Sequence, residues 1–458
     1  MILFSKGFAA PHRRAPAFQP FDRLSIRPDN GSRARRYPPA ASVRWIIRLY
    51  DRNFALTFVS NLLFVTANTL LAHFARWVTF LDGDKRDIGW IMGVGAVSAV
   101  LLRAWIGGWI DRIGPRRTWA VGNCLFIVTT LGYLALDDLG PAIYLLRVVN
   151  VLATAIVFTS ILVYMSHTVH PTRLVEAIGS MGAAGFMGMM IGPLTGGILL
   201  DGATRSYDDF VRLFGTVAGL AFLGLISLVL VRPVPPHPDA QQTAFFHYLQ
   251  TVRRHWPGSI LIISMTFGVC MAVPFGFLVE FIDAAGLEPI ALGPLRINPM
   301  GTFFLIYASW GLFLRIILRR LPERIGRRRQ VALGMVFMAA GMLCYPLVDH
   351  TRLLVLPALL CGTAHSLTFH TMTGLVMQSF PSELRGVGAA LALMALDGGM
   401  VCGGPLLGQV AYYAGYSAMF TCIAAICSAA VVVFWITIPA RKSADEQPTA
   451  ELCPSTES

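Results

Sequence analysis

Charged side chains are scarce in this chain. Asp, Glu, Lys and Arg make up 14% of its 458 residues and hydrophobic residues 55%, whereas an average soluble domain has about 25% charged residues. The sequence also lacks an HExxH pair, a nucleophile elbow and a Walker loop, so nothing in it supports an enzyme or an ATP-driven pump. The eight cysteines have no metal-ligand spacing. We therefore expect no catalytic site, no metal and no cofactor.

The apolar residues gather in long runs. Each run is long enough to cross a bilayer, and a segment in hydrocarbon must satisfy its own backbone hydrogen bonds, so we expect each to be a helix. The sequence thus predicts an all-α integral membrane protein surrounded by a lipid bilayer. Its twelve expected transmembrane helices span residues 54–76, 88–108, 118–136, 141–165, 174–200, 210–231, 258–282, 298–320, 330–348, 353–378, 386–413 and 417–438.

The net charge of +12 would suit a nucleic-acid-binding protein, but its placement argues against one. Basic residues concentrate in alternate gaps between the runs, such as Arg116, Arg117 and the segment 327–329, while the other gaps carry acids such as Asp82 and Asp84. Loops of a membrane protein that are rich in Lys and Arg lie in the cytoplasm. We therefore expect a protein of the cytoplasmic (cell) membrane with both termini cytoplasmic and no nucleic-acid partner.

The longest predicted cytoplasmic loop, residues 232–257, divides the helices six and six. Residues 1–53 are polar, basic and rich in proline, and they lack the apolar core of a secretory signal. We expect them to form a disordered cytoplasmic tail rather than a docking arm. The predicted organisation is a first bundle over 54–231, the linker, a second bundle over 258–438 and a cytoplasmic tail over 439–458.

Two separate motifs recur 212 residues further along the chain. The segment 107–117 matches 319–329, with Arg103 matching Arg315 upstream, and Gly192-Pro193 recurs as Gly404-Pro405. Because two independent motifs share one offset, we expect two pseudo-symmetric six-helix bundles related by an axis along the membrane normal. Such parallel repeats place the substrate near the bilayer midplane, between the halves.

The first motif consists of glycines, an acid and arginines: Gly107, Asp111, Arg112, Gly114, Arg116 and Arg117, preceded by Arg103. It resembles the loop motif between helices 2 and 3 of the major facilitator superfamily, which keeps a second copy where this chain has Glu323, Arg324 and Gly326. The resemblance covers residues 54–438 and implies the fold of that superfamily. It also implies a contact between halves that stabilises one access state. On charge alone, the arginines could be only a topology signal, and Asp111 could favour the start of the next helix.

The second motif lies in the predicted helix 174–200 and consists of Gly179, Gly188, Gly192, Pro193, Gly196 and Gly197. Its spacing is similar to the antiporter motif of exporter branches, the drug or metabolite:proton antiporters. Independently, small residues four apart let helices approach closely, and the proline should bend its helix. The repeat of the motif is Gly404, Pro405 and Gly408. A role in packing alone and a role in restricting leak both remain open.

Ionisable and polar residues at membrane depth are costly and are therefore candidates for function. Asp397 could carry a proton or form a structural ion pair. The family resemblance implies a role in proton transfer for Arg147, although this chain has Asn150 and Val151 where the family often has a Gln-Gly pair. Arg147 shares a predicted face with Asn150 and could equally bind an anionic substrate group. His365 and His370 are about 140° apart around their helix, so we expect only one to face a cavity. The remaining candidates are Asn61, Asn68 and Glu280.

The resemblance implies a secondary active transporter that moves a small organic solute by alternating access. Proton-coupled efflux is favoured by the antiporter-type motif, with protons as the coupling ion. A proton-coupled uptake symporter is the alternative, and a sensor or scaffold that does not transport is an alternative of another class, because a fold does not fix its function. We expect a monomer.

Overall fold

The computed structural model of the chain describes residues 50–169, 173–200, 205–234, 245–292, 295–318, 321–381 and 384–437. Both predicted tails lie largely outside these residues. Ten helical segments of the described part are long and apolar enough to cross a membrane. The last of these segments, Val387–Thr437, contains two predicted spans, so the ten segments account for eleven of the predicted helices. The twelfth is α3, which has 29 residues. The predicted all-α fold of twelve transmembrane helices is confirmed.

The first half contains six spans. The first span is interrupted by a 3-10 turn and continues to Phe80, four residues beyond its predicted end at residue 76. The elements of this half are α1 (Arg52–Leu70), η1 (Leu71–His73), α2 (Phe74–Phe80), α3 (Lys85–Ile113), α4 (Pro115–Gly132), η2 (Tyr133–Ala135), α5 (Pro141–Thr168), α6 (Leu174–Leu199) and α7 (Tyr207–Val229).

The second half follows a short helix, α8 (Phe245–Arg254), which lies within the predicted linker. Its first span is interrupted by a π-helical stretch, η4, where Pro274 lacks a backbone donor. The elements of this half are α9 (Ile260–Ala272), η4 (Val273–Phe277), α10 (Leu278–Ala284), β1 (Ile290–Leu292), β2 (Leu295–Ile297), α11 (Pro299–Ile317), α12 (Leu321–Ile325), α13 (Arg327–Cys344), η6 (Tyr345–Leu347), η7 (Thr351–Leu354), α14 (Val355–Gln378) and α15 (Arg385–Thr437).

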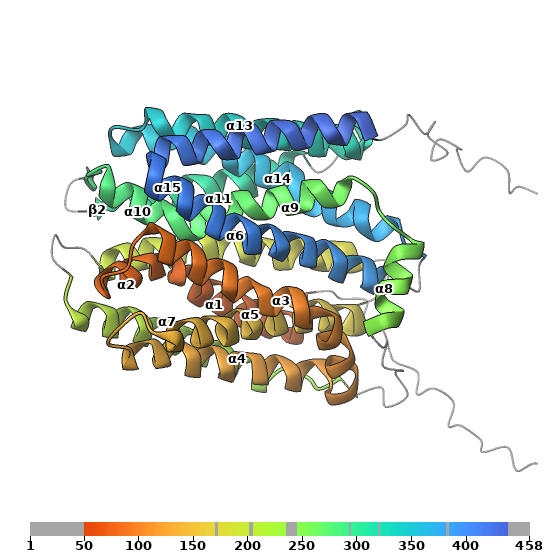
Figure 1. Cartoon of the computed structure of the whole chain (residues 1–458). Helices are drawn as coiled ribbons and strands as arrows, with labels where there is room; N and C mark the ends of the chain where they lie inside the picture. The colour runs from red at the N-terminus through yellow and green to blue at the C-terminus, as the bar shows by residue number, and fades with distance from the viewer. Residues whose placement is uncertain are drawn as a thin grey trace, which may run out of the picture. The chain divides into compact units, whose positions relative to one another are not determined.

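The last two predicted spans both lie in α15, which has a kink at Gly415, where the backbone is not helical. This residue has φ 81°, a conformation that a glycine adopts without steric cost. The β1 and β2 strands form a two-stranded antiparallel hairpin between α10 and α11, with Ile290 opposite Ile297. We call the end of the bundle with this hairpin the hairpin end, and the opposite end, where α8 lies, the motif end (Figure 1).

The repeated loop motif has the same backbone conformation in both halves. Gly114 ends α3 with φ 94°, and Gly326 precedes α13 with φ 84°. A side chain at either position would be strained. The structure places Asp111 in the last turn of α3, which runs to Ile113. Asp111 therefore lies shortly before the start of α4, which begins at Pro115, but within α3.

The halves pack as two neighbouring helix bundles, α1–α7 and α9–α15 (Figure 1). Within the first half, α1 packs against α6 and α7, and α4 packs against α5. Within the second half, α13 packs against α14, and α9 packs against α15. The most extensive helix contacts between the halves are those of α3 with α15 and of α6 with α11. These two crossings position the candidate site.

Candidate functional site

The halves meet at the hairpin end through glycines of α3 and α15. A Cβ added to Gly404 would lie 2.6 Å from the carbonyl oxygen of Gly89, and one added to Gly93 would lie 2.6 Å from Cδ of Pro405. A Cβ on Gly408 would similarly lie 2.6 Å from the carbonyl oxygen of Lys85. Since these separations are shorter than real Cβ contacts, the crossing depends on the absence of side chains. Gly404, Pro405 and Gly408 therefore lie directly at the interface between halves.

The glycines of α6 have a different partner, α1 of the same half. A Cβ on Gly192 would lie 2.7 Å from the carbonyl oxygen of Thr66, and the hydroxyl of Thr69 donates to the carbonyl oxygen of Gly188 at 2.8 Å. Gly196 packs against His73 in the same way. Most of this motif thus brings α6 close to α1, as expected for helix packing.

Two members of the α6 motif behave differently. Gly197 faces Asn298 of the second half so closely that a Cβ has no room, whereas a Cβ on Gly179 would meet no atom within 4 Å. Pro193 contributes its carbonyl oxygen, 3.0 Å from Nε2 of His73. Because a carbonyl only accepts, Nε2 carries the proton, and Nδ1 is left to accept from Arg76 at 3.2 Å.

A charged cluster also joins the halves at the hairpin end. Arg76 of α2 donates to Asp283 of α10 through Nε at 2.9 Å and Nη2 at 2.7 Å, and Arg205 donates to the same carboxylate at 2.9 Å. The Arg76 side chain is 8% exposed and that of Asp283 is 27% exposed, so only the arginine is largely removed from water. Sequence reasoning missed these three residues, because each lies at or beyond the end of a predicted span. Glu280, a predicted candidate, lies in the same helix one turn before Asp283.

A second ion pair crosses between the halves nearer the motif end. Nη2 of Arg103 on α3 lies 2.5 Å from Oδ2 of Asp397 on α15, and Nε of Arg103 lies 3.0 Å from the same oxygen. The side chains are 7% and 14% exposed. Thr159 of α5 approaches Nη1 of Arg103 at 3.4 Å. Asp397, predicted as a proton carrier or an ion-pair partner, thus has a cation from the other half.

Among the described side chains of the loop motif, Arg103 contacts the other half and Arg116 contacts its own half. Arg116 donates to the carbonyl oxygen of Val231 at 2.7 Å, which joins the start of α4 to the end of α7 within the first half. The side chains of Arg112, Arg117, Glu323 and Arg324 are exposed at the motif end. The Asp111 side chain lies outside the described residues.

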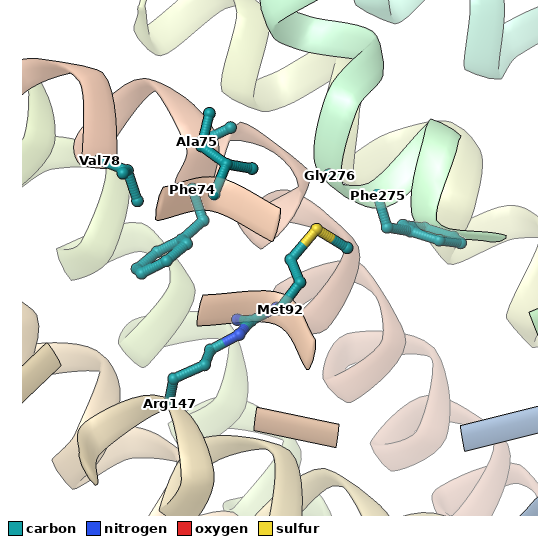
Figure 2. A pocket seen from close by; sticks show the side chains of 8 residues that line it. Phe74, Ala75, Val78, Met92, Arg147, Phe275 and Gly276 are labelled. Carbon is teal, nitrogen blue, oxygen red and sulfur yellow. The ribbon is translucent and has the colours of Figure 1, made fainter. Parts of the chain in front are cut away.

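A small cavity lies between the halves, close to the cluster of Arg76 (Figure 2). It measures about 10 Å³, room for about one water molecule. Arg147 of α5 extends into it, with the guanidinium 5.0 Å from the centre of the Phe74 ring and Nε buried without a hydrogen-bond partner. The lining residues are Phe74, Ala75, Val78, Ile88, Met92, Arg147, Phe275 and Gly276. The residue set is apolar except for one cation, so Arg147 is the polar group that a solute would meet.

The predicted polar residues of the first half do not all join this cavity. Asn150 donates to Thr129 of α4 at 3.0 Å, and Asn61 donates to the carbonyl oxygen of Met181 on α6 at 3.2 Å. Both amides are therefore used within the first half. Asn68 accepts from Thr154 at 3.3 Å and remains partly exposed.

The two predicted histidines differ in exposure and in their partners. His365 is buried, and its Nδ1 lies 2.5 Å from the hydroxyl of Tyr307, beside the ring of Phe186 from the other half. His370 is only partly buried. His365 thus has a hydrogen-bond partner in its own half, while His370 is the more accessible of the two.

Comparison with known proteins identifies the family. The sequence profile described as Major Facilitator Superfamily matches residues 53–403 and 299–452. The chain belongs to the Major Facilitator Superfamily. It is 24% identical over 387 residues to an uncharacterized MFS-type transporter of Mycobacterium tuberculosis, covering 80% of this chain and 87% of the relative. It is 20% identical over 389 residues to the staphylopine export protein of Staphylococcus aureus, covering 84% and 94%.

The solved structure of the nucleoside transporter NupG has the same fold, with a TM-score of 0.64 at 15% identity. The match covers 84% of this chain and 98% of that one. This chain is therefore a multi-pass membrane protein of the Major Facilitator Superfamily, a secondary transporter of solutes rather than an enzyme.

Proposed function

We propose that this transporter exports a small organic solute in exchange for protons, by alternating access between its two halves. The observation that carries the proposal is the ion pair between Arg103 and Asp397, which joins the halves inside the membrane. A proton bound by Asp397 would remove the negative charge and weaken the link across the halves. Proton binding and movement of the halves would then be two aspects of one equilibrium.

The proposed direction rests on the α6 motif and on the staphylopine export protein among the relatives. The motif end is taken as cytoplasmic, with both termini on that side, because basic residues such as Arg116, Arg117 and Arg324 lie there. The hairpin end would then face the outside. Glycine contacts and the Arg76–Asp283 pair close that end, which suits a state that loads its cargo from the cytoplasm.

Arg147 is the proposed contact for the cargo near the midplane. In the structure, Phe74 and Met92 of the first half and Phe275 of the second surround it (Figure 2). A cavity of about 10 Å³ has no room for a solute, so this side of the site is shut. We propose that Arg147 becomes accessible from the outside only when the halves separate at the hairpin end, which would release the cargo there.

The test uses proteoliposomes with a pH-sensitive dye inside and metabolite fractions from the host cell as the cargo source. We select the fractions that cause proton movement in proteoliposomes of the wild type but not of Asp397→Asn. Mass spectrometry of these fractions identifies the cargo. Asp349→Asn is the matched control, since Asp349 lies in an exposed loop. Cargo and protons moving in opposite directions support export. Movement in one direction would establish the symporter alternative, and no proton movement with any fraction would contradict the proposal.

A further inference from the structure

Arg315 of α11 is a partly buried cation inside the bundle. It lies at the crossing of α11 with α6, where its guanidinium fills the space that a side chain at Gly182 would need. Its Nη1 is buried and has no hydrogen-bond partner. Among the described residues, no carboxylate forms an ion pair with Arg315. A guanidinium nitrogen that is removed from water without an anion or another hydrogen-bond acceptor is costly.

The internal repeat shows which group is missing. Arg315 is the counterpart of Arg103, 212 residues earlier, and the counterpart of Asp397 at the same offset is Gly185 of α6. The first-half arginine thus has its carboxylate across the crossing of α3 and α15. The second-half arginine, at the equivalent crossing of α11 and α6, has a glycine instead. The symmetric position for a carboxylate exists, and the residue at that position is a glycine.

The space at this position is free, and its other neighbours cannot replace the anion. A Cβ added to Gly185 would meet no atom within 4 Å. Thr371, the counterpart of Thr159 beside Arg103, already accepts a hydrogen bond from Gln330 at 2.9 Å. His365 and His370 lie close enough to Arg315 to interact with it electrostatically, but an imidazole supplies no negative charge.

We propose that Arg315 binds a carboxylate group of the transported solute, which takes the place that Asp397 has in the other half. This rests on the proposed transport function and names the substrate class, an organic acid. The body of the acid would be apolar, because the rings of Phe186 and Phe369 each lie 5.3 Å from the ring of His365. An Arg–carboxylate pair of this kind is a strong charge-assisted interaction.

The first experiment tests the empty position without any ligand. Gly185→Asp and Gly185→Asn are compared in the wild type and in Arg315→Gln, as purified full chain in detergent. We expect Gly185→Asp to melt at a higher temperature than Gly185→Asn only when Arg315 is present, since only then can the new carboxylate pair. Equal melting temperatures in the presence of Arg315 would show that a carboxylate at this position does not reach the guanidinium, and would overturn the proposal.

The second experiment measures binding in nanodiscs of zwitterionic phosphatidylcholine, which offer no anionic lipid. The probes are benzoate and hexanoate, with benzamide and hexanamide as neutral matches. We expect the acids to bind more tightly than the amides, and Arg315→Gln to weaken the acids by roughly thirtyfold or more. Arg254→Gln, which changes an exposed arginine of α8 at the motif end, should bind as the wild type does. Acids that bind no better than amides, or equally well to Arg315→Gln, would overturn the proposal.

The two proposals can fail separately. Acids that bind through Arg315 without proton-linked export would leave this inference standing and remove the proposed function. Proton-linked export of a cargo whose affinity is unchanged by Arg315→Gln would keep the function and remove the inference.

Discussion

Arg103 and Asp397, which are 294 residues apart in sequence, meet inside the membrane with Nη2 2.5 Å from Oδ2. Nε of Arg103 lies 3.0 Å from the same oxygen, so one carboxylate oxygen holds both contacts. The pair joins α3 of the first half to α15 of the second. A change in its charge therefore acts directly on the relation between the two halves.

Asp397→Asn should abolish proton-driven transport but leave exchange of labelled for unlabelled cargo, which needs no net proton movement. The variant also leaves Arg103 unpaired, and breaking a buried ion pair costs about 3–5 kcal/mol, so its melting temperature should fall. The double variant Arg103→Gln/Asp397→Asn should recover stability without recovering coupling. Proton-driven transport in the double variant would show that the pair is only structural.

Asp283→Asn should open the hairpin end. Asp283 holds both Arg76 and Arg205, and without its charge the two guanidinium groups repel each other. We expect a cysteine placed at Met92, in the cavity between the halves, to react faster with a membrane-impermeant thiol reagent. The measurement needs a background without the native cysteines, and Asp349→Asn is the control. An unchanged labelling rate would mean that the glycine contacts alone close this end.

Gly192→Ala should lower the melting temperature, while Gly179→Ala in the same helix and motif should not. The new Cβ at 192 would meet the carbonyl oxygen of Thr66 at 2.7 Å, and overpacking of this kind costs roughly 1–3 kcal/mol. At 179 the space is open, and alanine is the better helix former. Proton leak through liposomes, measured in the same variants, separates the two roles left open for the motif. If proton leak rises only in variants whose melting temperature falls, packing is the only role of the α6 motif.

Asp84→Ala should destabilise the start of α3 by about 1 kcal/mol at neutral pH. The Asp84 carboxylate accepts from the backbone N–H groups of Arg86 at 2.7 Å and Asp87 at 3.1 Å, and Asp87 accepts from the N–H of Asp84 at 2.9 Å. Partial burial opposes ionisation, but the Arg86 guanidinium and these amides outweigh it and hold the pKa of Asp84 below its ordinary value of 3.8.

The sign of the pH effect follows from this lowered pKa. The stabilisation by Asp84 is complete above pH 3.8 and is lost as the pH falls through the lower pKa of the folded state. The difference in melting temperature between the wild type and Asp84→Ala should therefore shrink in acid. Glu288→Ala, at an exposed position, is the control. A difference that grows as the pH falls would contradict the assigned direction.

Much of the fold could be predicted because its signals are local. Span length, the charge of the loops and the 212-residue repeat are all read along the chain, and the matched glycines Gly114 and Gly326 confirm the repeat in the backbone. Helix interruptions were missed at Leu71–His73 and Val273–Phe277, because an apolar run looks the same whether its hydrogen bonds are regular or locally rearranged.

The candidate site was predicted less completely. Arg147 was found because a cation inside an apolar run is conspicuous, and Asn150 was grouped with it by helical spacing. Three residues rotate a side chain by about 60°, which is enough to turn Asn150 toward Thr129 of α4. Arg76 and Asp283 were missed because charges near span ends resemble ordinary interfacial residues.

By itself, the sequence determined that the chain crosses a membrane twelve times in two related halves, since hydrophobic length and repeated motifs need no knowledge of neighbours. Only the tertiary structure decided that Asp397 pairs with Arg103, that Asp283 pairs with Arg76, and that Arg315 has no anionic partner among the described residues. The physical reason is that an ion pair depends on the crossing and register of helices far apart in the chain. Gly185 is an example: the sequence shows a glycine there, but only the structure shows that Arg315 lies across the helix crossing from it.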